Sequence, residues 1–343
     1  MTSPRTTTAL TLREGGYATE AVPQVPASLE PFLELREVPL PDLREGQVLI
    51  AVIMAPVNPS DFFYLQGGYG RPRVAGVGAG FEGVGRVIAG KGAAAEALTG
   101  QRVAFMGTVT GSWAAHAVSD ALLCIPLRGE LRDEDGAALI VNPLTAAALV
   151  DLVQDREAPS FVLNAASSQL GRLILGLARD EGLQAIAVIR RPDDRDTLRE
   201  LGATEVLVSS AEDFAAAARA AVRSLKPRVL LDAVGDQVAA DLFFAMPAGT
   251  AWISYGKMSD EAPKLTQMGQ FIFMDKRIEG FWLSSWLPRL SRERRAELIA
   301  KVQDRFANGK WTTRVAAKLP LSEAIAGIVP AYRRNAGKVM LTP

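Results

Sequence analysis

The chain has 343 residues, with 38 basic and 38 acidic side chains, one histidine and one cysteine. This length is typical of two domains with buried cores, and the balanced charge argues against a surface built for nucleic acid. The lone Cys124 excludes an intrachain disulfide, and together with His116 it is too small a set for the three or four ligands of a zinc site.

No apolar run approaches the roughly 18–20 residues that a membrane-spanning helix needs. The N-terminal stretch Met1–Thr8 also lacks the apolar centre of a signal peptide. We therefore expect a cytoplasmic protein that binds neither a membrane nor nucleic acid.

Residues 1–140 are expected to form a β-rich barrel or sandwich. Asn58–Asp61 predicts a turn that caps a short helix, because Ser60 and Asp61 can accept hydrogen bonds from free N–H groups. Short apolar runs punctuated by Gly and Pro predict strands at the spacing of an all-β fold; these runs are 33–38, 47–54, 83–88, 102–105 and 112–119.

From residue 133 the pattern changes to strands that alternate with helices. An Ala- and Leu-rich helical pattern over 135–151 is interrupted at Asn142-Pro143. The predicted strands are 161–164, 185–189, 205–208, 229–231, 251–255 and 277–283, and the helices between them are 171–181, 194–201, 211–225 and 236–244. This alternation indicates a doubly wound parallel sheet. A long amphipathic helix over 291–308 follows, and then strand-like pieces that end with 337–341.

The run Phe161–Arg172 is the most informative stretch. An apolar strand turns through small residues into a helix, which is the geometry that binds a dinucleotide pyrophosphate. Against the pattern G-x-G-x-x-G, the glycine places hold Ala166, Ser168 and Gly171, so only the last glycine is kept. A turn without a ligand is the alternative interpretation.

The end of the next predicted strand favours NADPH over NADH. An NAD site usually places Asp or Glu there, whereas Arg190 and Arg191 follow the apolar run 185–189. Guanidinium groups can hold a 2′-phosphate with paired charge-assisted hydrogen bonds. Two solvated arginines at a strand end are the alternative.

Four stretches together resemble the medium-chain dehydrogenase/reductase superfamily: Asn58–Gly70, Asn142–Ala146, Asn164–Gly171, and Tyr255–Met258 with Gly280–Trp286. The resemblance is strongest to its zinc-free members, namely mitochondrial-type trans-2-enoyl-thioester reductases and quinone oxidoreductase-like proteins. It implies an α/β fold with a GroES-like β-barrel catalytic domain over 1–140, a Rossmann NADPH-binding domain over 141–287, and a return to the catalytic domain over 288–343. Where zinc-dependent members have Gly-His-Glu, this chain has Gly80-Phe81-Glu82, and phenylalanine cannot bind a metal.

The resemblance also implies roles for individual residues. Tyr69 matches the proton-donating or orienting tyrosine, and its hydroxyl is protonated at neutral pH; packing of its Gly-rich loop is the alternative. Asn58 is assigned to the catalytic site with it, and Trp286 to the substrate pocket. The cofactor contacts implied are Asn142, Thr145, Ala166, Ser167, Ser168, Gln169, Leu170, Gly171, Arg190, Arg191, Tyr255, Gly256, Lys257, Met258, Phe281, Trp282, Leu283 and Lys338.

Several of these residues have a structural alternative. Asn58 and Asn142 would serve as turn formers, although Asn142 before proline is biased to extended geometry that would turn its amide into the cleft. Phe281, Trp282, Leu283 and Trp286 would wall an acyl pocket or else belong to the core or a subunit interface. The arginines near the start of the last long helix would meet the phosphates of a thioester carrier or form a solvated face; they are Arg289, Arg292, Arg294 and Arg295.

Three ionisable or aromatic residues are expected to be structural: Tyr64 to pack, His116 to be a satisfied barrel residue, and Glu82 to pair with Arg86 or Arg102. Three functions then remain. The first is NADPH-dependent reduction of an enoyl thioester, the second is reduction of a quinone or alkenal, and the third is a cofactor-binding sensor without turnover. The strand over 276–283 would pair with its copy, so we expect a homodimer.

Overall fold

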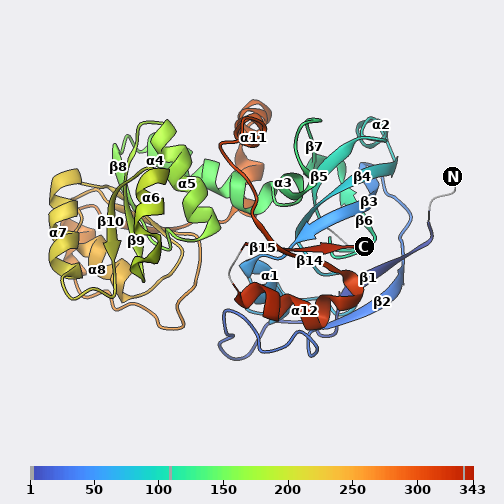
Figure 1. Ribbon diagram of the computed structural model, residues 1–343, viewed down its shortest axis with the longest axis horizontal. Coiled ribbons are helices and arrows are strands. Elements are labelled where there is room, and N and C mark those ends of the chain that lie inside the picture. The colour runs from blue at the N-terminus through green and yellow to red at the C-terminus, as the bar shows by residue number, and fades with distance from the viewer. Residues whose placement is uncertain (1–3, 108–109, 335–336) are drawn as a thin grey trace. The chain divides into compact units, whose positions relative to one another are not determined.

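The computed structural model describes residues 4–107, 110–334 and 337–343, so that Met1–Ser3 of the N-terminal stretch lie outside the described part. The chain divides into two compact units (Figure 1). Unit 1 combines Met1–Val141 with Val302–Pro343, and unit 2 is Asn142–Lys301. The return to unit 1 thus comes later than the expected residue 288. It falls inside α11 (Arg292–Ala307), whose Lys301 pairs with Asp151 and Glu181 of unit 2.

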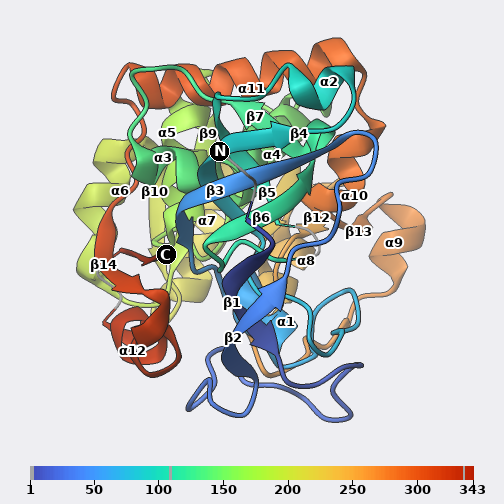
Figure 2. The same cartoon turned by 90° about the vertical axis from the view of Figure 1, so that its right-hand side faces the viewer.

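Unit 1 is built on antiparallel strands, as its punctuated apolar runs predicted. Seven strands form a sheet in the order β14-β15-β3-β4-β5-β7, with β6 also paired to β3, and β1 pairs with β2 in a separate ribbon (Figure 2). The strands are β1 (Thr6–Leu12), β2 (Leu33–Pro39), β3 (Gln47–Pro56), β4 (Glu82–Gly90), β5 (Arg102–Met106), β6 (His116–Asp120), β7 (Cys124–Pro126), β14 (Val315–Pro320) and β15 (Lys338–Thr342). The strand expected over 112–119 begins only at His116.

The helices of unit 1 are α1 (Pro59–Leu65), α2 (Ala93–Glu96), α3 (Asp133–Ala137) and α12 (Leu321–Arg333). Strand-like pieces were expected where α12 lies, and Gly327 and Pro330 within it are poor helix formers. The helix forms because its apolar face enters the core: Ile328 is fully buried in a cluster with Phe62 of α1 and Leu341 of β15. This cluster fixes α1 against the sheet.

Unit 2 is a parallel sheet of six strands in the order β10-β9-β8-β11-β12-β13. The central strands β8 and β11 are buried along their whole length, which suits strands covered on both faces. The strands are β8 (Ser160–Leu163), β9 (Gln184–Ile189), β10 (Ala203–Val208), β11 (Val229–Asp232), β12 (Ala251–Ser254) and β13 (Arg277–Gly280).

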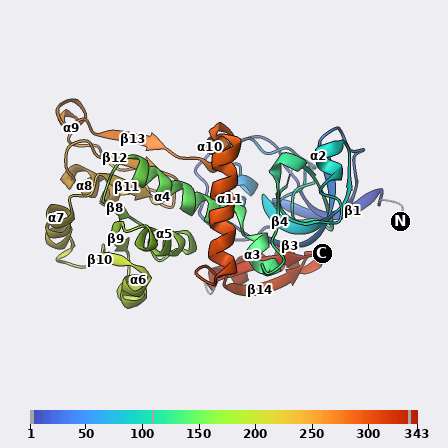
Figure 3. The same ribbon diagram turned by 90° about the horizontal axis from the view of Figure 1, so that it is seen from above.

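Helices cover both faces of this sheet, with α4, α5 and α6 packed in succession on one side and α7 and α8 on the other (Figure 1). Their bounds are α4 (Thr145–Asp155), α5 (Gln169–Asp180), α6 (Arg195–Leu201), α7 (Phe214–Leu225) and α8 (Gln237–Ala245). Two short helices, α9 (Gly269–Phe273) and α10 (Leu283–Trp286), flank the edge strand β13 (Figure 3). In the part of the chain that is described, no helix is both long and apolar enough to span a membrane.

Candidate functional site

In unit 2, the turn between β8 and α5 is closed by its own side chains. Ser168 caps α5, and its Oγ accepts a hydrogen bond from the N–H of Gly171 at 3.0 Å. A Cβ on Gly171 would lie 2.6 Å from the carbonyl oxygen of Ala166, so only glycine lets the helix start this close to the turn. Ala165 adopts a left-handed φ of 47°, a strained conformation found often at ligand-binding turns.

This turn places the first N–H groups of α5 at the carboxyl end of β8, which is the geometry a pyrophosphate needs. The helix begins at Gln169 rather than at the expected Gly171, because the cap is Ser168. Ser167, Gln169 and Leu170 are half-buried on the turn, and Ala166 is fully buried beneath it. The residues present therefore fit a dinucleotide, and their contacts with it stay predictions.

A buried carboxylate holds the loops at this edge of the sheet together. Asp232, the last residue of β11, accepts hydrogen bonds from the side chains of Asn164 and Trp252, the latter at 2.7 Å. It also accepts from the backbone N–H groups of Val234 and Gly235 at 2.8 and 3.0 Å. The carboxyl ends of β8, β11 and β12 are thereby fixed relative to one another.

Beyond β9, the two arginines expected to read a 2′-phosphate are both exposed. Within the described residues neither guanidinium has a hydrogen-bond or ion-pair partner. The nearby carboxylate of Asp194 is instead paired with Arg172 of α5 at 2.5 Å, and Arg172 also donates to the carbonyl of Ser167 at 3.1 Å. Arg190 and Arg191 therefore remain available to an anion next to the turn.

The segment after β12 contains the next predicted contacts. The N–H of Tyr255 bonds the carbonyl of Asp232, and Gly256 passes so close to Ala233 that a Cβ would lie 2.8 Å from its oxygen. The hydroxyl of Tyr255 is buried without a partner among the described residues, and burial with the nearby Asp232 raises its pKa. Lys257 and Met258 are exposed.

The expected strand 277–283 is shorter in the structure. β13 ends at Gly280, although the N–H of Phe281 still bonds the carbonyl of Ser254, and α10 starts at Leu283. The prediction of a strand that continues to Leu283 is therefore wrong, because a helix starts at that residue. Phe281 is buried and its ring lies 5.6 Å from that of Trp286, whereas Trp282 is 41% exposed.

The extended geometry expected for Asn142 is also wrong. Asn142 lies in a π-helical turn, Ile140–Leu144, that accommodates Pro143 and leads into α4. The N–H groups of Ile140 and Val141, which precede it, donate to Glu82 at 2.9 and 2.8 Å. These side-chain bonds satisfy the backbone where the wider turn interrupts the helix. Thr145 is buried at the start of α4.

In unit 1, Tyr69 belongs to an aromatic cluster with Tyr64 and Phe81. The ring of Tyr69 lies 5.1 Å from Phe81 and 6.3 Å from Tyr64, and the last two are 5.3 Å apart. Tyr64 and Phe81 are buried, while Tyr69 is half-buried. Tyr64 therefore packs as expected. The guanidinium of Arg71 lies 5.0 Å from the ring centres of both Tyr64 and Phe81.

Unit 1 also contains a buried polar network formed by Asn58, Asp61, Glu82 and Lys338. The amide nitrogen of Asn58 donates to Glu82 at 2.9 Å, and its amide oxygen accepts from the ammonium of Lys338. The N–H of Asn58 bonds Asp61 at 2.7 Å. This network joins the start of α1 to β4 and β15, so Asn58 and Lys338, predicted for catalysis and cofactor binding, have a structural role within unit 1.

Burial dominates the electrostatics of this network. It raises the pKa of Asp61 to about 7, against the lowering effects of the hydrogen bond from Asn58 and the charge of Lys338. Burial also raises the pKa of Glu82 and lowers that of Lys338. Two carboxyl groups thus share one ammonium group, and the protonation of Asp61 changes near neutral pH.

Three expectations for unit 1 are corrected here. Glu82 does not pair with Arg86 or Arg102: its side chain is buried and faces Asn58, while those arginines bond Gly100 and Asp133. Asp61 accepts a hydrogen bond at the start of α1, but the Oγ of Ser60 is buried without a partner among the described residues. His116 is half-buried and not fully satisfied, because its Nδ1 has no partner there either.

Phe81 occupies the place where the resemblance puts a metal ligand. Its ring is packed by Tyr64 and Tyr69, and the neighbouring Glu82 is committed to Asn58 and two backbone N–H groups. Across the described ranges, no group of three or more His, Cys, Asp or Glu side chains is arranged to hold a metal ion. The residues at this place do not fit a zinc ion.

Sequence reasoning missed Asp232 and Arg71. It also did not predict that Asp61 would join a buried network or that other aromatic rings would pack on Phe81. A signal existed for Asp232, since an acidic residue that ends a buried apolar strand must find donors. The network around Asp61 had no such signal, because Asn58 and Lys338 are 280 positions apart.

Comparisons with known proteins agree with this architecture. A family model for the alcohol dehydrogenase GroES-like domain matches residues 44–129, and one for zinc-binding dehydrogenase matches residues 170–304. The mitochondrial enoyl-[acyl-carrier-protein] reductase of Bos taurus is 31% identical over 303 residues, which are 86% of this chain and 80% of that protein. The human enzyme of the same name is 30% identical over 297 residues, 85% and 79% of the two chains.

Solved structures resemble the chain over its whole length. A candidate NADPH:quinone reductase from Mesorhizobium loti has a TM-score of 0.94 and 43% identity, with 100% of both chains covered. The complex of Etr1p with NADP and crotonyl-CoA has a TM-score of 0.80 over 98% of this chain and 100% of that one; at 21% identity this likeness shows the fold alone. The predicted α/β fold class, with a GroES-like unit and a Rossmann-like parallel sheet, is confirmed. The chain belongs to the medium-chain dehydrogenase/reductase superfamily of oxidoreductases, as a homologue of mitochondrial enoyl-[acyl-carrier-protein] reductases and NADPH:quinone reductases.

Proposed function

We propose that the protein reduces the C=C bond of a trans-2-enoyl thioester with NADPH. The observation that carries this proposal is the half-buried Tyr69, whose ring packs on Phe81 at the place where metal-dependent members of the superfamily have a ligand. A tyrosine hydroxyl is a hydrogen-bond donor that can act as the general acid, and C=C reduction requires a proton. The 31% identity with the bovine enoyl reductase over 80% of its length supports the same substrate class.

The two units have separate tasks in this proposal. NADPH, when bound, supplies the hydride. Unit 2 holds its pyrophosphate at the capped start of α5 and its 2′-phosphate with Arg190 and Arg191. Unit 1 presents the hydroxyl of Tyr69.

The balance of electrons and protons requires one proton donor, and in this proposal the donor is Tyr69. The hydride adds to the carbon β to the carbonyl, and the π electrons of the C=C bond move to the carbonyl oxygen. When they return, the α-carbon takes the proton of the Tyr69 hydroxyl, and solvent reprotonates the tyrosine. The products are the saturated thioester and NADP⁺.

Reduction of a quinone or alkenal is the second candidate. The 43% identity with the Mesorhizobium loti structure favours it, since that structure is described as a candidate NADPH:quinone reductase. A quinone accepts a hydride and a proton, so the same Tyr69 would serve.

A single assay separates these functions. The oxidation of NADPH is followed by its absorbance with a medium-chain trans-2-enoyl-CoA and, in parallel, with a simple benzoquinone, and each reaction is repeated with NADH. Turnover of the enoyl-CoA with NADPH supports the thioester reductase. Turnover of the quinone alone contradicts the first proposal and supports the second. Tight binding of NADPH without turnover of either acceptor would identify a sensor.

A further inference from the structure

Arg71 has an unusual environment for an exposed arginine. It follows Tyr69 by two residues, and its guanidinium lies over two buried rings, 5.0 Å from the centres of Tyr64 and Phe81. These contacts use the positive charge and leave its N–H donors unused. Within the described residues the guanidinium has no hydrogen-bond or ion-pair partner.

The two rings that support Arg71 are held rigidly. Tyr64 is on α1, and Phe81 immediately precedes β4. Asn58 at the start of α1 bonds Glu82 at the start of β4, so the buried network ties together the two elements that carry these rings. Gly80 adds to this rigidity, since a Cβ there would lie 2.4 Å from the ring of Trp113.

Tyr69 and Arg71 share this support. The ring of Tyr69 lies 5.1 Å from Phe81, the same ring that the guanidinium covers. The phenol ring of Tyr69 and the guanidinium of Arg71 therefore contact the same ring, that of Phe81. Arg73, the other arginine of this loop, has a different environment. It is buried and donates hydrogen bonds to the carbonyls of Gly16 and Leu65.

We propose that Arg71 binds the carbonyl oxygen of the acceptor and stabilises the negative charge that hydride transfer places on it. This inference rests on the proposed function and assigns that site a second group. A guanidinium stays protonated at any physiological pH, so it cannot supply the proton. The roles are thus divided: Arg71 donates hydrogen bonds to the oxygen, and Tyr69 gives its proton to the α-carbon. An oxyanion in a preorganised site of this kind gains far more from a donor than the ground-state carbonyl does.

The test uses a ligand that mimics the charged state without turnover. Acetoacetyl-pantetheine carries the thioester but no phosphate, and its enolate absorbs in the ultraviolet. Titrated into the full-length protein saturated with NADP⁺, it should show a lower apparent pKa for enolate formation than in buffer. Arg71→Gln should abolish this shift, and Arg71→Lys should restore part of it.

Matched measurements separate this role from a structural one. Arg44→Gln removes another exposed arginine of unit 1 and should leave the enolate signal unchanged. With the true acceptor, Arg71→Gln should lower kcat by about 10²–10³-fold without changing NADPH affinity, and millimolar guanidinium should partly rescue Arg71→Ala. The assignment of Arg71 is overturned if the enolate pKa shifts equally in the wild type and in Arg71→Gln. It is also overturned if the wild type shows no pKa shift, even when the enzyme reduces its acceptor. The protein could reduce no enoyl thioester while the enolate pKa still shifts in an Arg71-dependent way. In that case the anion-binding role of Arg71 stands and the proposed function is contradicted.

Discussion

Tyr69 is the residue on which the proposed chemistry depends most directly. Its ring is held by Tyr64 and Phe81, so a phenylalanine in its place keeps the same packing and loses only the hydroxyl. We expect Tyr69→Phe to lower kcat by about 10²–10⁴-fold, the usual range for a general acid, with little change in NADPH affinity. Steady-state kinetics and a fluorescence titration of NADPH measure the two effects. Tyr17→Phe, at an exposed tyrosine of the same unit, is the control. Full activity of Tyr69→Phe would remove the hydroxyl from the mechanism.

Asp61 makes the stability of unit 1 depend on pH. Its folded-state pKa of about 7 lies above the ordinary 3.8 because of burial. The charge of Lys338 opposes this shift and Glu82 adds to it, and the half-buried Tyr332 interacts with the same carboxyl group. The folded state therefore holds a proton that the unfolded state releases. This contribution is fully present below about pH 4 and is lost as pH rises to about 7.

Asp61→Asn should flatten that dependence. The amide oxygen still accepts from the N–H of Asn58, but the ionised carboxyl group is no longer buried at high pH. Between pH 5 and 8 we expect the free energy of unfolding of the variant to rise relative to wild type, by up to about 3 kcal/mol. Urea unfolding at both pH values measures it, with the exposed Asp42→Asn as the control. A constant difference between wild type and variant would show that Asp61 does not titrate in this range.

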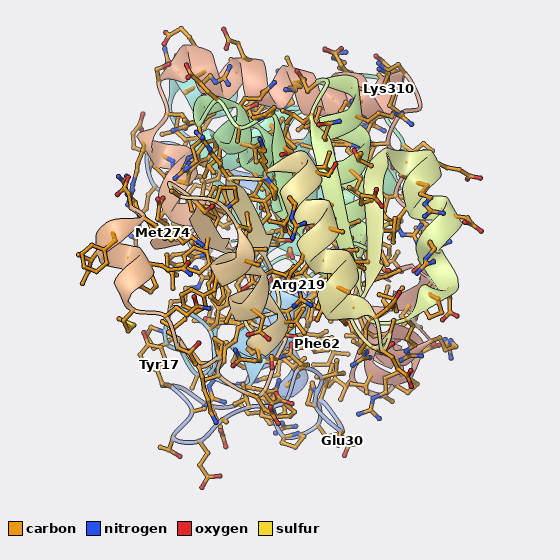
Figure 4. The ribbon with its side chains drawn as sticks, turned by 90° about the vertical axis from the view of Figure 1, so that its left-hand side faces the viewer. Tyr17, Glu30, Phe62, Arg219, Met274 and Lys310 are labelled. Atoms are coloured by element: carbon orange, nitrogen blue, oxygen red, sulfur yellow. The ribbon has the colours of Figure 1, made fainter. Side chains whose placement is uncertain are left out.

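At the scale of elements, we propose that the residues at the carboxyl end of β9 set the choice between NADPH and NADH. Arg190 and Arg191 leave β9 exposed and, as far as the described chain shows, without partners. Replacing both with alanine should weaken NADPH binding by about 10–100-fold, the loss expected from one or two charge-assisted hydrogen bonds. The affinity for NADH should be almost unchanged. Two exposed arginines of α7, Arg219 (Figure 4) and Arg223, provide a control double variant with the same change in charge. Equal losses for the two cofactors would refute the phosphate contact.

The strand β13 is the second element with a testable consequence. It lies at the edge of the sheet of unit 2, and Ile278 on it is 42% exposed. The adjoining α9 ends next to Met274, which is labelled in Figure 4. The helix carries Ile272 and Phe273, which are 75% and 85% exposed. An edge strand beside exposed apolar side chains is a surface that a second copy can cover, and we propose that β13 pairs with its copy in a homodimer.

Ile278→Lys should disrupt this assembly, because a lysine from each copy would bring like charges into the interface. Light scattering after size exclusion should show a dimer for wild type and a monomer, or a dissociation constant raised by at least tenfold, for the variant. Leu122→Lys, at a 72% exposed leucine of unit 1, should remain dimeric. A monomeric wild type, or an unaffected variant, would contradict the proposal.

At the scale of the whole molecule, the chain leaves unit 1 at Val141 and returns at Val302, each time inside a helical segment. Unit 1 is therefore completed only when its last 42 residues are in place, and these include Lys338 of the buried network. Unit 2 is one uninterrupted segment. The cytoplasmic location expected from the sequence stays a prediction.

The sequence by itself determined what depends on local pattern. The alternation of strands and helices in unit 2, the strand–turn–helix run over Phe161–Arg172, and the two arginines that follow β9 all depend on residues close together in the chain. Hydrophobic periodicity and capping act within a few residues, so they can be read without the fold.

Only the tertiary structure decided where buried charges meet and which irregular segments form. Glu82 lies beside Asn58 and Lys338 because three distant elements pack together, and its bonds to Ile140 and Val141 keep Asn142 in a π-helical turn. The helix α12 forms despite Gly327 and Pro330 because burial of its apolar face outweighs local propensity. Buried polar groups must find partners wherever the packed chain supplies them, and sequence spacing does not reveal those partners.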